Sequence, residues 1–305
     1  MKNYERRHTM ARFAALICLA GAIFTGFAPG TAPAADPTMT PTVVQDGALA
    51  TDWVTGHKSR TRLTAGSTAA LAGQPGQLYA FVEIELAEGW KTYWKSPGDS
   101  GIPPRFEFAK SGNLRSAEVL YPAPKRIADK GDVIIGYAGT VAFPVVLTAE
   151  DPLKPIELAA DVQFGMCKDI CVPTEARLKL IIPSDAQGAL SFAATASLGR
   201  VPHPREAQTV SDPKIASLSV DLKSVTPQIT LTAEFPSGAE GADAFLEAPN
   251  GLYLPLLTKT AQTGSSVTFA ADVSKDVDLA ALAGKFIAVT LISDAGAAES
   301  SFKFE

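Results

Sequence analysis

The sequence predicts an all-β protein made of two successive β-sandwich domains with a short helical linker between them. Three observations support this fold class. Short apolar or alternating runs recur along most of the chain, turns rich in glycine and proline separate them, and only residues 187–200 have a helical composition. Strands that follow one another without intervening helices are typical of sandwiches and not of alternating β-α units.

The first 34 residues have the order of a secretory signal peptide. A positively charged segment at 2–12 precedes an apolar run at 13–27, and small residues up to Ala34 supply a cleavage site. A membrane anchor is the alternative, but the apolar run is short and interrupted by glycine. We therefore expect export to the periplasm, cleavage near Ala34 and a flexible lead-in over residues 35–50, and no transmembrane segment in the mature chain.

The first β domain is expected over residues 51–185, and its many short strands indicate a β-sandwich. Polar residues on one face of segment 59–65 suggest an edge strand. Trp90 and Trp94 share one strand face and are expected in the core, whereas Tyr93 points to the other face. The expected strands are 59–65, 78–86, 90–94, 105–108, 117–121, 133–137, 141–147, 156–164 and 175–182.

Residues 186–204 are expected to form a helical linker, because alanine and leucine dominate until a Val-Pro-His-Pro sequence ends the segment. A second β-sandwich domain is expected over residues 205–305. Its expected strands are 218–225, 228–235, 244–247, 252–257, 266–273, 285–293 and 301–304.

The candidate chemistry lies at Cys167 and Cys171, because the third cysteine, Cys18, falls in the expected leader. Four extended residue steps would separate their Cα atoms by about 13–14 Å. A disulfide needs about 4.4–6.8 Å, so residues 168–170 must form a turn. A disulfide that closes so small a loop restricts the unfolded chain very little. The spacing therefore favours a redox role over a stabilising one.

Three functions remain open from the spacing alone. The pair is a redox couple, a permanent disulfide of an exported module that docks a partner, or a Cu(I) site formed by Cys167, Cys171 and the adjacent Met166. Lys168 would favour a thiolate by its charge, and Asp169 would oppose it. The first function would make the protein a thiol-disulfide oxidoreductase of the protein-disulfide reductase type; the other two are non-enzymatic binding functions.

Composition argues against several other classes. The formal net charge is −5 and there is no basic cluster, which is unfavourable for nucleic-acid binding. The sequence has no nucleophilic-hydrolase, phosphate-loop or dinucleotide signature. We expect no cofactor.

Four segments together carry a family resemblance. They are residues 89–104 (GWKTYWKSPGDSGIPP), 121–124 (YPAP), 136–137 (GY) and 165–173 (GMCKDICVP). Their combination resembles the exported N-terminal domain of DsbD-type thiol:disulfide interchange proteins, above all the suppressor-of-copper-sensitivity B (ScsB) branch, which links it to copper tolerance. The resemblance covers residues 53–182 and, more weakly, the later domain.

The resemblance implies an immunoglobulin-like thiol domain that relays electrons without a cofactor. Its electron source would be a membrane electron-conduit protein, and its recipients would be oxidised, thioredoxin-like periplasmic proteins. It also implies that Cys171 meets the partner disulfide and that Cys167 resolves the mixed disulfide. The chain shows neither the membrane domain nor the thioredoxin-like domain of full-length relatives, so we expect separate proteins to supply them.

The resemblance also implies a cover over the cysteines. DsbD has an aromatic cap loop, but the corresponding residues 125–132 contain no aromatic side chain. We therefore expect Ile127, or Tyr137 further along, to act as the cap. Tyr93 and Asp129 are further candidates for tuning the thiols.

Overall fold

The computed structural model describes residues 43–45, 48–66, 77–98, 101–129, 132–186, 190–221, 225–249, 252–274 and 277–304. The expected signal peptide, residues 1–34, lies outside this range. Within the described residues, no helix has both the length and the apolar character needed to cross a membrane.

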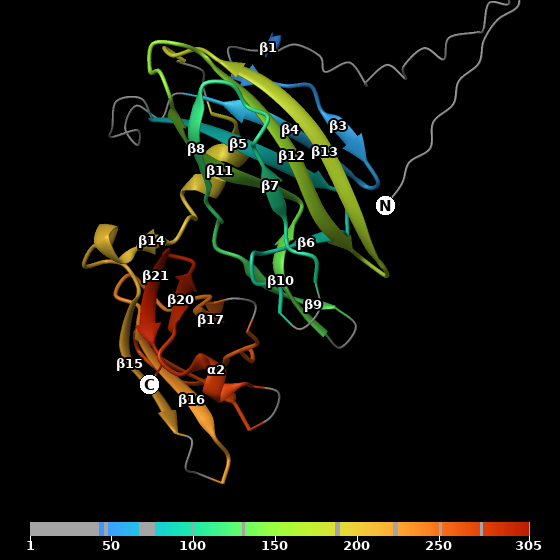
Figure 1. The fold of residues 1–305 in the computed structure, drawn as a ribbon. Coiled ribbons are helices and arrows are strands. Elements are labelled where there is room, and N and C mark those ends of the chain that lie inside the picture. Colours follow the sequence, from blue (N-terminus) through green and yellow to red (C-terminus); the bar gives the residue numbers. More distant parts are fainter. Residues whose placement is uncertain are drawn as a thin grey trace, which may run out of the picture. The chain divides into compact units, whose positions relative to one another are not determined.

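Two antiparallel sheets form the first β domain (Figure 1). One sheet has the order β1-β2-β4-β5-β11-β8, with β3 also paired to β4. Its strands are β1 (Val43–Gln45), β2 (Ala48–Ala50), β3 (Val54–Gly56), β4 (Ser59–Ala65), β5 (Gln77–Leu86), β8 (Leu114–Val119) and β11 (Thr140–Ala149). The other sheet has the order β13-β12-β6-β10-β9, with β7 paired to β12. Its strands are β6 (Lys91–Tyr93), β7 (Arg105–Glu107), β9 (Lys125–Asp129), β10 (Asp132–Ala138), β12 (Ile156–Cys167) and β13 (Cys171–Ile182).

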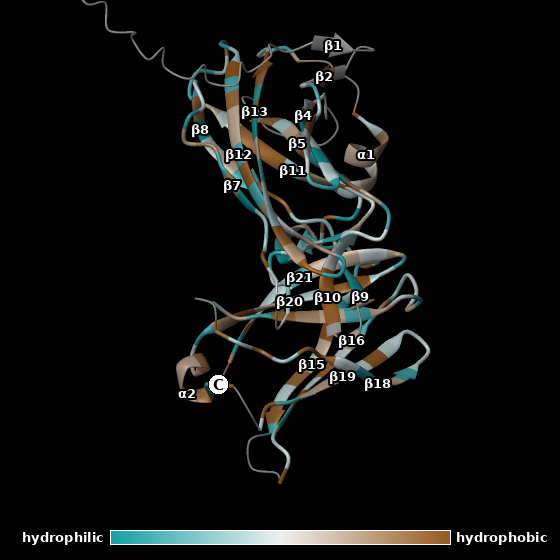
Figure 2. Cartoon of the chain, turned by 90° about the vertical axis from the view of Figure 1, so that its right-hand side faces the viewer, coloured by the Kyte–Doolittle hydropathy of each residue, from teal (hydrophilic) through white to brown (hydrophobic). Residues whose placement is uncertain are grey.

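A hydrophobic core lies between these two sheets. Alternate residues of β12 contribute to it, and hydrophobic segments recur along β11 and β12 (Figure 2). Phe143 of β11 is fully buried and lies 5.4 Å, between ring centroids, from Tyr137 of β10. Burial of an aromatic or branched side chain contributes about 1.5–3 kcal/mol, so this shared core fixes both sheets.

The second β domain contains two four-stranded sheets around a core of its own. One sheet has the order β14-β21-β20-β17 and the other β15-β16-β19-β18. The strands are β14 (His203–Pro204), β15 (Lys214–Asp221), β16 (Gln228–Glu234), β17 (Asp243–Glu247), β18 (Thr258–Thr263), β19 (Ser266–Asp272), β20 (Phe286–Ser293) and β21 (Gly296–Lys303). The helical elements are α1 (Phe192–Leu198), η1 (Arg205–Ala207) and α2 (Leu279–Leu282). The predicted fold class, two successive β sandwiches with a short helix between them, is confirmed.

Two strand predictions were wrong. Segment 59–65 is not an edge strand, because β4 pairs with β2, β3 and β5. Its polar side chains have partners on β5, which the alternation alone does not reveal. Residues 252–257 form no strand; Pro255 lacks the N–H that a ladder needs. The strand in this region is β18, whose six residues are all exposed and give no apolar pattern.

Two segments expected to lack regular structure contain strands. Within the lead-in assigned to residues 35–50, β1 and β2 pair with each other, and β2 pairs with β4. Backbone N–H and C=O groups of β4 need hydrogen-bond partners, and β2 provides them. This pairing outweighs the loop-like composition of the segment. The stretch expected as a cap loop contains β9, which pairs with β10.

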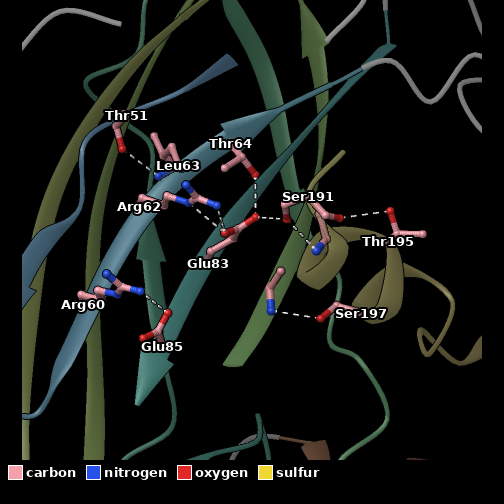
Figure 3. Close-up of polar contacts among 12 residues, drawn as sticks. Thr51, Arg60, Arg62, Leu63, Thr64, Glu83, Glu85, Ser191, Thr195 and Ser197 are labelled. Carbon is pink, nitrogen blue, oxygen red and sulfur yellow. Dashed lines mark hydrogen bonds and ion pairs between the residues drawn. The ribbon is translucent and has the colours of Figure 1, made fainter. Parts of the chain in front are cut away.

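Glu83 is a buried carboxylate that connects β4, β5 and α1 (Figure 3). Its Oε2 accepts a hydrogen bond from Nε of Arg62 at 2.9 Å. Its Oε1 accepts from the hydroxyl of Thr64, at 3.1 Å, and from the hydroxyl of Ser191. Ser191 is also the N-cap of α1, where its Oγ accepts from the backbone N–H of Ala194. This carboxylate therefore links the helix to the sheet, beside the hydrogen bond that Oγ of Ser197 accepts from the backbone N–H of Ala142 at 3.0 Å.

We expect Glu83→Ala to lower the free energy of unfolding by about 3 kcal/mol, because Arg62 and two hydroxyl groups lose a buried acceptor. Glu85→Ala is the matched control, since Glu85 lies two residues further along the same strand. Its ion pair with Arg60 is exposed at both ends, so the expected cost is below about 1 kcal/mol. Urea denaturation measures both. Equal losses of unfolding free energy in the two variants would show that the buried carboxylate of Glu83 does not anchor the helix.

Candidate active site

Cys167 ends β12 and Cys171 begins β13, so the two thiols face each other across a hairpin. The strand register pairs the two residues directly, and residues 168–170 form the turn. Directly paired residues in an antiparallel ladder have Cα atoms about 4.5–5.5 Å apart, which suits a disulfide. Both side chains are thiols, and their Sγ atoms are 3.0 Å apart. Closing them to a disulfide of about 2.05 Å needs a movement of about 1 Å.

The two sulfur atoms have different surroundings. Cys167 is buried, with 9% of its surface exposed, in a small cluster with Tyr93 and Ile134. Ile127 packs against the same cluster. Cys171 is exposed. A macromolecular disulfide can therefore reach Cys171, while Cys167 is shielded behind it.

Tyr93 lies beside the two thiols because of the alternation along β6. This strand pairs with the end of β12. Trp90 and Trp94 point into the large core, whereas the Tyr93 hydroxyl lies 2.9 Å from Sγ of Cys171. Burial raises the pKa of Tyr93, and its hydrogen bonds to Cys171 and Cys167 raise it further. The phenol therefore keeps its proton and can donate it in a hydrogen bond to a thiolate.

Two glycines allow the strands to approach closely around Tyr93. A Cβ atom at Gly136 would lie 2.0 Å from the carbonyl oxygen of Thr92. A Cβ atom at Gly165 would lie 2.6 Å from Cβ of Ile102 and 3.1 Å from the ring of Tyr93. Only glycine fits such contacts without displacing backbone. These glycines therefore help to fix the tyrosine beside the hairpin.

The cover over Cys167 is an aliphatic pair on a hairpin. Ile127 of β9 and Ile134 of β10 are paired across the ladder. Both pack in the cluster that contains Cys167. The sequence indicated Ile127 as a candidate cap. It did not indicate Ile134, whose position is typical of an ordinary strand residue. The relevant signal is the β9–β10 register, which places these residues opposite each other.

Strand alternation keeps two other candidates away from the thiols. Tyr137 is on the face of β10 opposite to Ile134; it lies in the large core, and its hydroxyl donates to the carbonyl of Pro122 at 2.7 Å. The expectation that Tyr137 is a cap does not agree with this position. Met166 is likewise fully buried in the large core, on the face of β12 opposite to Cys167.

The charged candidates lie at the surface. Lys168 is exposed and extends over the turn at Gly89, where an added Cβ would lie 3.1 Å from its Nζ. Asp169 is also exposed. The side chain of Asp129 lies outside the described part of the structure. Among the residues described, no group of three or more His, Cys, Asp or Glu side chains is arranged to hold a metal ion.

We expect Tyr93→Phe to slow alkylation of Cys171 by about tenfold near neutral pH, because the thiolate loses a donor worth about 1.4 kcal/mol. The rate is measured with iodoacetamide at fixed pH in a background with Cys18→Ala and Cys167→Ala, in which Cys171 is the remaining thiol. Tyr137→Phe is the matched control, since it removes a buried hydroxyl that has no thiol contact. Identical alkylation rates for the two variants would contradict a role for Tyr93.

Comparisons with known proteins agree with this geometry. Residues 61–183 match the family described as "Thiol:disulfide interchange protein DsbD, N-terminal". The structure is similar to the N-terminal periplasmic domain of ScsB from Proteus mirabilis, with a TM-score of 0.61 and 22% sequence identity. The similarity covers 84% of this chain and 98% of that one. No curated protein sequence matches the chain. Residues 61–183 therefore match the DsbD N-terminal family, and the fold of the chain is similar to that of the ScsB periplasmic domain.

Proposed function

We propose that this protein is an exported thiol:disulfide exchange protein whose Cys167/Cys171 couple passes reducing equivalents to oxidised partners. One observation carries the proposal: an exposed thiol and a buried thiol lie 3.0 Å apart at the end of a rigid hairpin. The match of residues 61–183 to a thiol:disulfide interchange family supports it. On this proposal the protein is an oxidoreductase of the protein-disulfide reductase type.

The reaction has two exchange steps. The Cys171 thiolate attacks one sulfur of the partner disulfide, which forms a mixed disulfide and releases the other partner sulfur as a thiolate. The Cys167 thiolate then attacks Sγ of Cys171, which breaks the mixed disulfide and releases the second partner thiolate. The partner gains two electrons, and two protons complete its thiols. The couple ends as a disulfide, which an external dithiol must reduce.

The surroundings of the couple suit these steps. Cys171 is accessible for the first attack, and Tyr93 can donate a hydrogen bond to its thiolate. Cys167 needs only a short movement for the second attack, because its Sγ is already in contact with that of Cys171. Ile127 and Ile134 shield Cys167 from direct reaction with other molecules.

The proposed setting is the periplasm, which the DsbD resemblance and the predicted signal peptide support. The proposed electron source is a membrane electron-conduit protein, and the proposed recipients are thioredoxin-like periplasmic proteins. Ile170, in the cysteine turn, is 66% exposed, and Ile102, next to Gly165, is 42% exposed. These apolar side chains offer a contact surface for a partner.

The position of Met166 favours exchange over Cu(I) binding. Its side chain is buried in the large core, so the thiols lack the third sulfur ligand that the sequence suggested. The exposure of Cys171 favours exchange over a permanent structural disulfide, because reactive disulfides are accessible and structural ones are mostly buried.

Trapping tests the proposed roles. Cys167→Ala removes the resolving thiol, so a mixed disulfide between Cys171 and periplasmic partners is expected to accumulate. Cys171→Ala leaves a shielded thiol and is expected to trap at least about tenfold less. Non-reducing gels and mass spectrometry of the cross-linked species measure both. The proposal fails if neither variant traps a partner, or if Cys171→Ala traps as much as Cys167→Ala.

A further inference from the structure

The strands that surround the dithiol also contact the second β domain. All described residues belong to one compact unit, and the large core cluster includes Phe245 and Ile292 of that domain. Ion pairs between the domains lie at two segments of the first domain: the end of β6 and strand β9. These are the segments that supply Tyr93 and Ile127 to the cysteine site.

Arg126 of β9 makes the most extensive of these contacts. Its Nε and one terminal nitrogen donate to the two carboxylate oxygens of Asp243 at 2.9 and 2.8 Å. The same terminal nitrogen donates to the carbonyl of Leu257 at 3.0 Å, and the guanidinium lies 5.3 Å from the ring centre of Phe245. The side chains of Arg126 and Asp243 are only 27% and 19% exposed. Such bidentate, partly buried pairs are stronger and better oriented than surface ion pairs.

The end of β6 is held in a second way. Lys95 lies 2.9 Å from a carboxylate oxygen of Glu299 and 3.3 Å from one of Glu247. The rings of Trp94 and Phe245 are 5.5 Å apart. Burial raises the pKa of Glu247, although Lys95 opposes the shift. Of the two anchors, the pair between Arg126 and Asp243 is the bidentate one, whereas Lys95 meets each of its two carboxylates through one oxygen.

Strand alternation connects this anchor to the thiols. Neighbouring side chains of a strand point to opposite faces, so Arg126 reaches the second domain while Ile127 packs on the Cys167 cluster. The same relation holds at β6, where Trp94 meets Phe245 and Tyr93 meets Cys171. Displacing Arg126 would thus move Ile127 in the same strand.

We propose that the second β domain positions the dithiol cover, with Arg126 and Asp243 as positioning residues that hold Ile127 over Cys167. This assigns a role to the second domain in the exchange reaction, and it rests on the proposed function for its biological meaning. Neither residue touches a reacting sulfur. Their effect is on how often the cover opens and exposes Cys167.

The test uses the full chain with Cys18→Ala and Cys171→Ser, in which Cys167 is the remaining thiol and serves as the reporter. Arg126→Ala or Asp243→Ala is expected to speed alkylation of Cys167 by about tenfold, because loss of the bidentate pair frees β9. The double variant is expected to be no faster than the single ones, since both remove one contact. Arg126→Lys, which keeps the charge but not the bidentate contact, is expected to restore part of the protection.

Lys110→Ala is the control, because it removes an exposed ion pair with Asp161 that lies on β12, away from β9. Its alkylation rate is expected to stay unchanged. Hydrogen exchange distinguishes positioning from general destabilisation: amides of β9 and β10 should exchange faster in Arg126→Ala, and those of β11 should not. An unchanged Cys167 rate, or equal acceleration in all strands, would overturn the proposal. The reporter cannot complete an exchange cycle, so this result is independent of partner trapping by the native thiols.

Discussion

The direct pairing of Cys167 with Cys171 across the end of the β12–β13 hairpin is the constraint on which the site depends. A three-residue turn leaves the two residues directly opposite each other, so their sulfur atoms can meet. The rest of the hairpin is long and fully paired, and its inner face is part of the core. The position of the couple is therefore set by the sandwich and not by the turn alone.

The chemical asymmetry of the couple follows from the same strands. Tyr93 of β6 and Ile134 of β10 pack against Cys167 and bury it, whereas Cys171 remains exposed. β9 adds Ile127 on top of this enclosure. The exposed thiol and the buried thiol thus differ by packing, although they are four residues apart. The side chains that pack on Cys167 from the β9–β10 hairpin are aliphatic.

The sequence predicted what short-range patterns determine. Strand alternation separated Trp90 and Trp94, which lie in the core, from Tyr93, which lies at the thiols. Spacing alone required the turn between the cysteines. Positions that depend on pairing between distant strands were not predictable in this way. Tyr137 was misjudged because its face depends on the register of β10, and the central position of β4 depends on its pairing with β5.

Long-range ion pairs could not be predicted from the sequence either. Nothing local indicates that Arg126 meets Asp243, or that Ser191 joins Arg62 and Thr64 around Glu83. In both clusters a carboxylate in one element holds a segment far away in the chain. The cluster around Glu83 attaches the linker helix to the sheet. The pair between Arg126 and Asp243 connects the second domain to the strand that carries Ile127.

The reduction potential of the Cys167/Cys171 couple tests the central claim most directly. It is obtained by equilibrating the protein with glutathione buffers of defined ratio and measuring the disulfide fraction by mass after alkylation. A couple that exchanges with partners is expected to lie between about −270 and −120 mV, the range of thiol-exchange proteins. A potential below about −300 mV, typical of structural disulfides, would contradict the account.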